Sequence, residues 1–296
     1  MGVDTAMPER VLKPEIKNDD TSLISSEEFF QELNMADVYL PVQTEISPVA
    51  PESRIVVHND PRSAGADRFR LVKMRLQNFQ AAKKLKTLLI TSPLPGDGKT
   101  TVALNLATAL SEKGKRPVLL LEADVYRPTL CKKLGLRPWA GLTECFENRR
   151  DPMQAIRRID PLGFYLLPAG RATEDGSSLL QSEFTSQLIT GLAATSFDWV
   201  LIDAPPTTPI AEILVLRGQS DATLLVARAG VTPREAIEDS IRNLGRDHIQ
   251  GIILNDVDGL DRIYSHYYGY YTKSEGGAKP QKSKGVQGLG LKPHGR

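Results

Sequence analysis

The chain alternates short, wholly apolar runs with longer amphipathic stretches, and this pattern limits the folds open to it. Six apolar runs follow residue 85: TLLITS, VLLLEAD, FYLLPAG, WVLIDAP, ATLLVARAG and GIILNDV. A strand that is apolar throughout is buried on both of its faces, which is typical of a parallel sheet covered by helices on both sides. The sequence therefore predicts an α/β fold with a mostly parallel sheet between two layers of helices.

The two ends of the chain differ in charge from its middle. Residues 1–60 contain 12 acidic and 4 basic residues, whereas residues 272–296 contain 6 basic residues and 1 acidic residue. We predict an acidic, Pro-rich and largely disordered arm over 1–60, a folded domain over 61–262, and a tyrosine cluster with a basic disordered tail over 263–296. The net charge of the whole chain is only +1, which gives no reason to expect a nucleic-acid partner.

An amphipathic helix is expected just before the first apolar run. Residues 65–85 contain no proline, and the apolar residues Phe69, Val72, Leu76 and Phe79 recur at spacings of three and four. The remaining positions are rich in Lys and Arg. The stretch therefore predicts a helix with one apolar face toward the domain and a strongly basic polar face.

Composition also bears on the compartment. The only cysteines are Cys131 and Cys145, which fits a reducing compartment and argues against a disulfide framework. No apolar run approaches the ~18 residues of a transmembrane helix, and the first residues lack the pattern of a secretory signal. We expect a cytoplasmic protein that reaches the inner face of the plasma membrane only through a partner.

The segment TLLITSPLPGDGKTTVALNLATAL carries the strongest chemical signal. It places GDGKT between a buried strand and a helix, where backbone N–H groups can curl around phosphates. Lys99 would reach the β- and γ-phosphates of ATP, and the Thr100 hydroxyl would bind Mg²⁺. The pattern departs from a full P-loop because Pro93 stands at the first glycine position, and the alternative is a Gly-rich turn with an incidental lysine. The predicted nucleotide-binding residues are Gly96, Asp97, Gly98, Lys99, Thr100 and Thr101.

Two later strands end in carboxylates. WVLIDAPPTTP runs into Asp203, and VLLLEADVYRP contains Glu122 and Asp124, whose alternate positions point the same way from an extended segment. Near bound ATP, Asp124 and Asp203 would join Thr100 in holding Mg²⁺, and Glu122 or Asp124 would accept a proton from an attacking hydroxyl. The predicted catalytic residues are Lys99, Glu122, Asp124 and Asp203. The alternative is that Asp124 caps the next helix while Glu122 forms a salt bridge.

Five of the eight tyrosines fall in one short stretch, IYSHYYGYYTK. They follow the last predicted strand, and the stretch contains a glycine, so we expect them to be exposed. Such hydroxyls on an ATP-binding chain are natural phosphate acceptors, since each phosphate adds about two negative charges. The alternative is an aromatic patch that docks a partner. The predicted phosphoacceptors are Tyr264, Tyr267, Tyr268, Tyr270 and Tyr271.

Taken together, these features resemble the bacterial protein tyrosine kinases of the CpsD/CapB type. The resemblance rests on the P-loop, the second acidic strand end known as Walker A′, the Walker B strand ending in Pro-Pro, and the C-terminal tyrosine cluster. It covers roughly residues 60–272 and extends to the phrases SDATLLVARAGVTPREAIEDSIRNLG and GIILNDV. It implies a P-loop NTPase fold and an autokinase, dependent on ATP and Mg²⁺, that regulates the polymerisation and export of capsule or exopolysaccharide.

The resemblance also implies partners. Members of this family assemble through a Glu-x-x-Arg-x-x-Arg motif on the helix before the P-loop, and this chain has Asp67, Arg70 and Lys73 at that spacing. It implies a homo-oligomeric ring in which one subunit's site receives its neighbour's tyrosines, a membrane-embedded chain-length regulator as activator, and a cognate tyrosine phosphatase. Asn255, in the last predicted strand, is implied as an adenine contact.

Several positions depart from the family pattern. Walker A′ of the family reads Asp-x-Asp-x-Arg, whereas this chain has Glu122 at the first position and Tyr126 at the last, with Arg127 one position later. Ala204 follows the Walker B aspartate in place of Ser or Thr. Moving a catalytic group by ~1 Å can cost about a hundredfold in rate. These departures favour an alternative, a catalytically weak nucleotide-gated assembly module of the same polysaccharide machinery.

A third hypothesis is a partitioning ATPase with a related P-loop. Such proteins carry a second lysine early in the P-loop, where this chain has Leu94. That hypothesis also leaves the tyrosine cluster without a purpose, so the kinase is the preferred interpretation.

Overall fold

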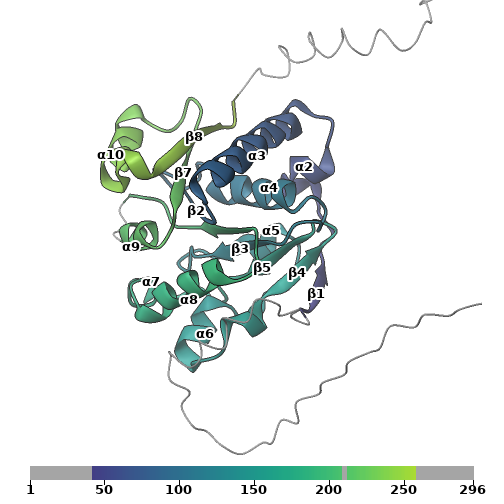
Figure 1. The fold of residues 1–296 in the computed structure, drawn as a ribbon, viewed down its shortest axis with the longest axis vertical. Helices are drawn as coiled ribbons and strands as arrows, with labels where there is room; N and C mark the ends of the chain where they lie inside the picture. The colour runs from purple at the N-terminus through teal and green to yellow at the C-terminus, as the bar shows by residue number, and fades with distance from the viewer. Residues whose placement is uncertain (1–41, 209–211, 258–296) are drawn as a thin grey trace, which may run out of the picture.

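A single eight-stranded sheet organises the protein (Figure 1). The computed structural model describes residues 42–208 and 212–257. The strand order is β1-β4-β5-β3-β6-β2-β7-β8, and all neighbouring strands are parallel except the antiparallel pair β4 and β5. The strands are β1 (Thr44–Ile46), β2 (Thr87–Thr91), β3 (Val118–Glu122), β4 (Arg157–Asp160), β5 (Phe164–Leu167), β6 (Trp199–Asp203), β7 (Ala222–Arg228) and β8 (Ile249–Asn255).

Helices cover both faces of this sheet. In Figure 1, α2, α3 and α4 lie on one side of the central strands, and α6, α7 and α8 lie on the other. The helices are α2 (Val56–Asn59), α3 (Ala64–Lys83), α4 (Lys99–Ser111), α5 (Leu130–Lys133), α6 (Leu142–Asn148), α7 (Gly176–Leu180), α8 (Glu183–Ala194), α9 (Glu212–Gly218) and α10 (Arg234–Leu244). Short 3₁₀ turns occur at Pro51–Ser53, Pro152–Ala155 and Arg246–His248. The predicted α/β fold with a mostly parallel, doubly covered sheet is confirmed.

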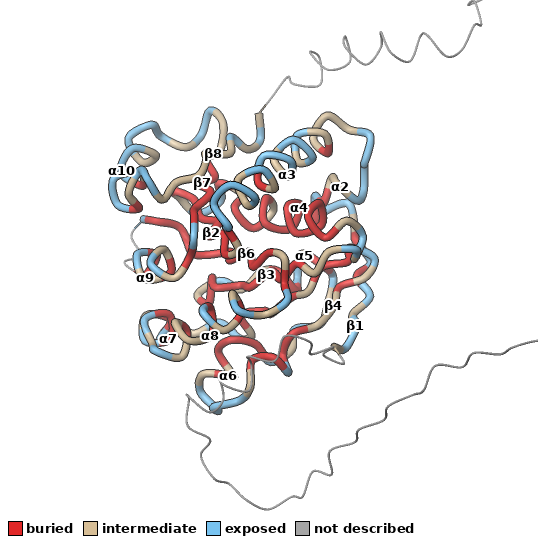
Figure 2. Tube along the Cα trace, viewed as in Figure 1, coloured by how far each residue is buried: buried red, intermediate tan, exposed pale blue. Residues whose placement is uncertain are grey.

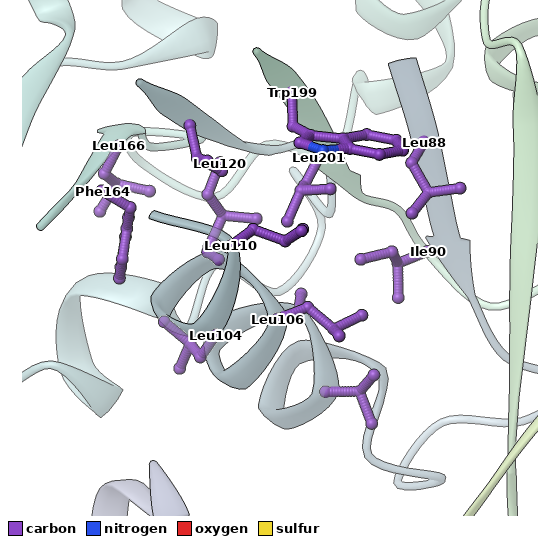
Figure 3. Close-up of a cluster of buried hydrophobic side chains, with 14 of the residues drawn as sticks. Leu88, Ile90, Leu104, Leu106, Leu110, Leu120, Phe164, Leu166, Trp199 and Leu201 are labelled. Carbon is purple, nitrogen blue, oxygen red and sulfur yellow. The ribbon is translucent and has the colours of Figure 1, made fainter. Parts of the chain in front are cut away.

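The core consists of two apolar clusters, one on each face of the sheet. Alternate residues of a strand enter different clusters: Leu88 and Ile90 of β2 face α4, whereas Leu89 faces the opposite helices. Figure 2 shows the central strands buried along their length. Figure 3 shows Trp199 and Leu201 of β6 beside α4. Burying a large side chain of this kind contributes roughly 1.5–3 kcal/mol, so this layer fixes α4 and the loop before it against the sheet.

All six predicted apolar runs form strands, and the structure adds two that were not predicted. β1 and β4 pair with each other in parallel at one edge of the sheet. Their sequences, TEI and RRID, are short and largely polar. β1 is the edge strand and β4 lies next to it, and most of their residues are only half-buried or exposed. The sequence pattern therefore contains no signal for them.

Residues 42–60 differ from the expectation of a disordered arm. They contribute β1 and α2, and the side chain of Ile55 is fully buried in the cluster above α4. The remainder of the predicted arm, residues 1–41, lies outside the described residues. The folded unit thus begins earlier than the predicted boundary at residue 61.

The predicted amphipathic helix is α3. Leu76 is buried, and Phe69, Val72 and Phe79 pack against the same cluster, so the predicted apolar face is the one that contacts the domain. The hydroxyl of Ser63 caps its first turn by accepting a hydrogen bond from Ala66 N at 3.2 Å. Among the helices of the described residues, none combines the length and the apolar character that crossing a membrane requires.

Candidate functional site

The P-loop joins the end of β2 to the first turn of α4. Gly96 and Gly98 have φ angles of +90° and +98°, in the left-handed region that suits glycine. A Cβ atom on Gly98 would lie 2.0 Å from Nδ2 of Asn255, so this position also excludes any side chain. The N-terminus of α4 therefore opens directly from a glycine turn, where its free N–H groups favour an anion.

The buried side chain of Asp97 stabilises the conformation of the P-loop through hydrogen bonds. Its carboxylate is buried and accepts hydrogen bonds from Leu94 N at 2.9 Å and from the Thr232 hydroxyl at 2.7 Å. Its carbonyl oxygen accepts a third from Nδ2 of Asn255 at 2.9 Å. Asp97 and Asn255 thus fix the loop to the β7 and β8 side of the sheet, and their predicted direct contacts with nucleotide stay predictions.

Lys99 lies between two carboxylates. Its Nζ is 2.7 Å from Oδ2 of Asp124, 3.6 Å from Oδ1 of Asp203 and 3.4 Å from the hydroxyl of Thr100. Burial acts to lower the pKa of Lys99, but the charges of Asp203 and Asp124 outweigh it and hold the pKa above its usual value. The lysine is therefore charged and available to bind an anion. The structure brings together four of the predicted residues here: Lys99, Thr100, Asp124 and Asp203.

Asp203 is the most deeply buried carboxylate of the site. It has no solvent exposure, and within the described residues neither of its oxygens has a geometrically acceptable hydrogen-bond donor. Burial raises its pKa, and the charge of Lys99 opposes that rise. A buried carboxylate with unused oxygens beside the Thr100 hydroxyl and Asp124 is a donor set that suits Mg²⁺, which prefers oxygen ligands. The residues present therefore fit the predicted metal.

Glu122 lies next to this site but faces other partners. Its Oε1 accepts hydrogen bonds from Thr129 N at 2.6 Å and Leu130 N at 2.8 Å, and its Oε2 accepts one from Ala169 N at 3.1 Å. Burial raises the pKa of Glu122 to about 7, although the three backbone donors act in the opposite direction. Glu122 therefore anchors the start of α5 to the end of β5. Its predicted catalytic role stays a prediction.

Asp124 and Tyr126 of Walker A′ make contacts with different parts of the protein. Asp124 accepts a hydrogen bond from Arg127 N at 3.3 Å through the oxygen that does not face Lys99, so it also shapes the following turn. The hydroxyl of Tyr126 donates to Oε1 of Glu212 at the start of α9, at 3.1 Å. Tyr126 thus ties Walker A′ to α9. The side chain of Arg127 is exposed.

Three further residues near the P-loop were not found from the sequence. Nδ2 of the buried Asn105 donates to Arg54 O at 2.9 Å, and its Oδ1 accepts from Val57 N at 3.2 Å, so it binds the segment before α3. Thr232, which bonds Asp97, lies in a loop whose sequence has no distinguishing feature. Lys133 of α5 donates to the hydroxyl of Thr101 at 3.3 Å. The polar Asn105 in the otherwise apolar stretch VALNLATAL was the one available signal.

A cavity of about 540 Å³ adjoins Glu122 on the side of α5 and α6. Its walls include Pro128, Trp139 and Arg171. The ring of Trp139 is fixed by its indole N–H, which donates to Ala155 O at 2.8 Å, and by Arg157, whose guanidinium lies 4.6 Å from the ring centroid. The cavity therefore combines an aromatic wall with a cationic side chain next to Walker A′.

The predicted assembly residues lie together on α3. Arg70 pairs with Asp67 one turn earlier and donates to Pro61 O, and Nζ of Lys73 lies 2.7 Å from Oε1 of Glu112. The structure therefore shows them in contacts within the chain, and their role in assembly stays a prediction. The predicted phosphoacceptors, from Tyr264 to Tyr271, lie outside the described residues.

Comparison with known proteins identifies relatives of this arrangement. A model of the ParA family, described as NUBPL iron-transfer P-loop NTPase, matches residues 84–240. Over 222 residues the chain is 27% identical to tyrosine-protein kinase YwqD of Bacillus subtilis, a match that covers 74% of this chain and 92% of that protein. Over 235 residues it is 31% identical to the succinoglycan biosynthesis transport protein ExoP of Rhizobium meliloti. That match covers 74% of this chain but only 29% of ExoP.

Solved structures agree with this relationship. The BceF tyrosine kinase domain superposes with a TM-score of 0.61 at 26% identity, covering 77% of this chain and 96% of that chain. The chain therefore matches nearly the whole length of a kinase domain and of YwqD, and about a third or less of the longer ExoP.

Proposed function

We propose that this chain, which belongs to the ParA family of P-loop NTPases and is homologous to the bacterial tyrosine kinases, is an ATP-dependent protein tyrosine autokinase. The observation that carries the proposal is the convergence of Lys99 with Asp124 and the buried Asp203 at the start of α4. Nucleotide binding follows from membership of the family, and transfer to tyrosine is the step proposed here.

The residues of the site divide the work of phosphoryl transfer. The N–H groups of the glycine turn and the Nζ of Lys99 bind the phosphates and offset the charge that develops as the γ-phosphoryl group moves. The group passes from ATP to a tyrosine oxygen, ADP leaves, and the phenol proton goes to a nearby carboxylate, Asp124 or Glu122. Thr100, Asp124 and Asp203 would hold Mg²⁺, which supplies further neutralisation of the phosphate oxygens when bound.

The acceptor tyrosines are Tyr264, Tyr267, Tyr268, Tyr270 and Tyr271. We propose that these tyrosines approach the bound phosphates through the cavity beside Glu122. Glu122 lies two residues before Asp124, and Asp124 contacts Lys99. Transfer between neighbouring copies in a ring assembled through Asp67, Arg70 and Lys73 would bring each tail to another subunit's site.

The setting of this activity is proposed from the relatives. ExoP is named as a succinoglycan biosynthesis transport protein, and YwqD as a tyrosine-protein kinase. We infer a role in regulating exopolysaccharide or capsule polymerisation and export, with activation by a membrane-embedded chain-length regulator at the inner face of the plasma membrane. A cognate tyrosine phosphatase would remove the phosphate groups from the tyrosine cluster.

One observation favours the alternative, a nucleotide-gated assembly module without efficient transfer. Both oxygens of Glu122 accept hydrogen bonds from backbone N–H groups, so this carboxylate is directed at the start of α5 and at Ala169 rather than at Lys99 and a bound phosphate. The kinase nevertheless remains the proposal, because Asp124 is available as a second carboxylate beside Lys99.

The test uses the tryptic peptide 263–273, which contains all five acceptors. Its phosphorylation is measured by mass spectrometry in protein isolated from the native cells, beside Lys99→Met in the same background. Phosphate on the wild type and none on the variant is the expected result. Phosphate on both would mean that another kinase modifies the tail. No phosphate on either, in protein that binds ATP, would establish the assembly module instead.

A further inference from the structure

Lys133 is a cation held in the site without a carboxylate of its own. Its side chain is half-buried at the end of α5, and its Nζ donates to the hydroxyl of Thr101, in the first turn of α4, at 3.3 Å. Within residues 42–208 and 212–257, no Asp or Glu oxygen lies within 4.0 Å of that Nζ. A partly desolvated ammonium that hydrogen-bonds one neutral hydroxyl retains unused donors.

Other cations surround it. Burial lowers the pKa of Lys133, and repulsion from Arg54 and Lys99 adds to that effect, whereas Asp203 opposes it. The three cations Lys99, Lys133 and Arg54 face the two carboxylates Asp124 and Asp203, which leaves one positive charge in excess at the start of α4. This arrangement is unfavourable without an anion and becomes favourable when one binds.

The rigid placement of α5 makes this position specific. Glu122 accepts hydrogen bonds from Thr129 N and Leu130 N, so the carboxylate at the end of β3 fixes the first turn of α5. Lys133 N in turn donates to Thr129 O at 2.9 Å. Lys133 therefore reaches the P-loop from an anchored helix.

The order of the strands in the sheet indicates which phosphate of the nucleotide Lys133 can contact. Asn255 and Thr232 fix the P-loop from the β7 and β8 side, whereas Asp124 and Asp203 approach from the β3 and β6 side. The residues that would hold the metal mark the end of the site where the terminal phosphates lie. The first turn of α5 is hydrogen-bonded to Glu122 at the end of β3, and Lys133 is close enough to Asp203 and Lys99 for their charges to act on it, so it lies on that terminal side.

We propose that Lys133 is a second phosphate-binding lysine that contacts the terminal phosphate of the nucleotide and so distinguishes ATP from ADP. The inference deepens the proposed function, because it assigns nucleotide selectivity to a residue of the same site. Lys99 serves both nucleotides, while Lys133 adds a charge-assisted hydrogen bond that only a triphosphate can complete. ATP is then bound tightly before the γ-phosphoryl group is transferred, and the ADP that remains is bound less tightly.

The test is calorimetric titration of the full chain with the non-hydrolysable analogue AMP-PNP and with ADP, each with Mg²⁺. Lys133→Met, which keeps the apolar stem, is expected to weaken AMP-PNP binding by about tenfold or more and ADP binding by less than about twofold. Lys133→Arg should keep most of the preference for the triphosphate. Lys132→Met, an exposed neighbour on the same helix with the same change in net charge, is the matched control.

Three results would overturn the inference. The first is that Lys133→Met weakens the affinity for AMP-PNP and for ADP equally, and the second is that it weakens neither. The third is that Lys132→Met changes the two affinities in the same way as Lys133→Met. Because the readout is binding, Lys133 can be confirmed even if the tyrosine peptide is never phosphorylated, and the kinase can be confirmed even if Lys133 proves inert. If Lys133→Met fails to fold, Lys133→Gln is titrated in its place and judged by the same ratio of the two affinities.

Discussion

The Nζ of Lys99 lies 2.7 Å from Oδ2 of Asp124 and 3.6 Å from Oδ1 of Asp203, in a site where Asp203 is fully buried. One cation thus lies between two carboxylates. The same ammonium is the group that a phosphate would attract, so nucleotide binding competes with an existing ion pair. The lysine therefore matters for the fold of the site as well as for its chemistry.

The first prediction concerns this double role. Lys99→Met leaves Asp124 and Asp203 near each other with no cation between them, so the free energy of unfolding at pH 7 should fall by about 3 kcal/mol. The loss of unfolding free energy should be smaller at pH 5. Burial raises the pKa of Asp203, so this carboxylate takes up a proton as the pH falls, which relieves its repulsion from Asp124. Urea denaturation at both pH values measures it. An equal loss at both would contradict the proposed cause, and circular dichroism of the variant shows whether it is folded in the phosphorylation test.

Asp203 yields a prediction in which stability and binding change in opposite directions. Burial raises the pKa of Asp203, and Lys99 and the Thr100 hydroxyl offset only part of that rise, so the charged form is held at a cost to folding. Asp203→Asn should leave the free energy of unfolding unchanged or raise it by about 1 kcal/mol. The same variant should lose most of the Mg²⁺ dependence of ATP affinity, measured by titration with and without the metal. Full retention of that dependence would remove Asp203 from the metal site.

Glu122 predicts how stability changes with pH. Its pKa is about 7 in the folded protein against 4.5 for the ordinary side chain, so the folded state holds a proton that the unfolded state releases. This contribution, about 3 kcal/mol, is fully present below pH 4.5 and is lost as the pH rises to about 7. The unfolding free energy of the wild type relative to Glu122→Gln should fall across that window.

Urea denaturation at several pH values between 4.5 and 8 measures the difference. Glu52→Gln, at an exposed carboxylate on the first 3₁₀ turn, is the control and should show no comparable trend. A difference between wild type and Glu122→Gln that stays constant with pH would show that Glu122 is ionised throughout.

The link between Asp97 and Thr232 connects the P-loop to the loop after β7. The Thr232 hydroxyl donates to Oδ1 of Asp97 at 2.7 Å and accepts from Arg228 N at 2.7 Å. Thr232→Val leaves both partners unsatisfied, so we expect a loss of about 1–3 kcal/mol in unfolding free energy and weaker ATP binding. A double-mutant cycle with Asp97→Ala should give a coupling energy of about 1 kcal/mol. Simple additivity of the two losses would show that the bond contributes nothing.

The sequence predicted the parts of this site that depend on strand pattern alone. Parallel strands end at one edge of a sheet, so the apolar runs before Lys99, Asp124 and Asp203 were enough to bring these residues together. Alternation also placed Glu122 on the same side of its strand as Asp124. It could not show that backbone N–H groups at the start of α5 would bond one oxygen of Glu122 and that Ala169 N would bond the other.

The remaining contributors depend on contacts between distant segments. Thr232 bonds a residue 135 positions away, and Lys133 reaches a helix 32 positions earlier. Such pairs leave no local period or motif. The same holds for β1, whose three residues are recognisable as a strand only through pairing with β4, more than 100 positions later.

Asn105 gives the last prediction, because it clamps the segment before α3 onto the P-loop helix. Its side chain bonds Arg54 O, Val57 N and, within its own helix, Thr101 O. Asn105→Leu removes all three bonds and leaves buried backbone groups unpaired, so the unfolding free energy should fall by about 2 kcal/mol. The bond between Arg54 and the buried Ile55 should also become more accessible to trypsin.

Limited proteolysis followed by sequencing of the new N-terminus detects that opening as a fragment that begins at Ile55. Thr108→Val is the matched control, since Thr108 is equally part of α4 but its hydroxyl bonds only Leu104 O among the described residues. We expect faster release of the fragment from Asn105→Leu than from either Thr108→Val or the wild type. Equal rates in all three would show that Ile55 and its apolar neighbours hold the segment without Asn105.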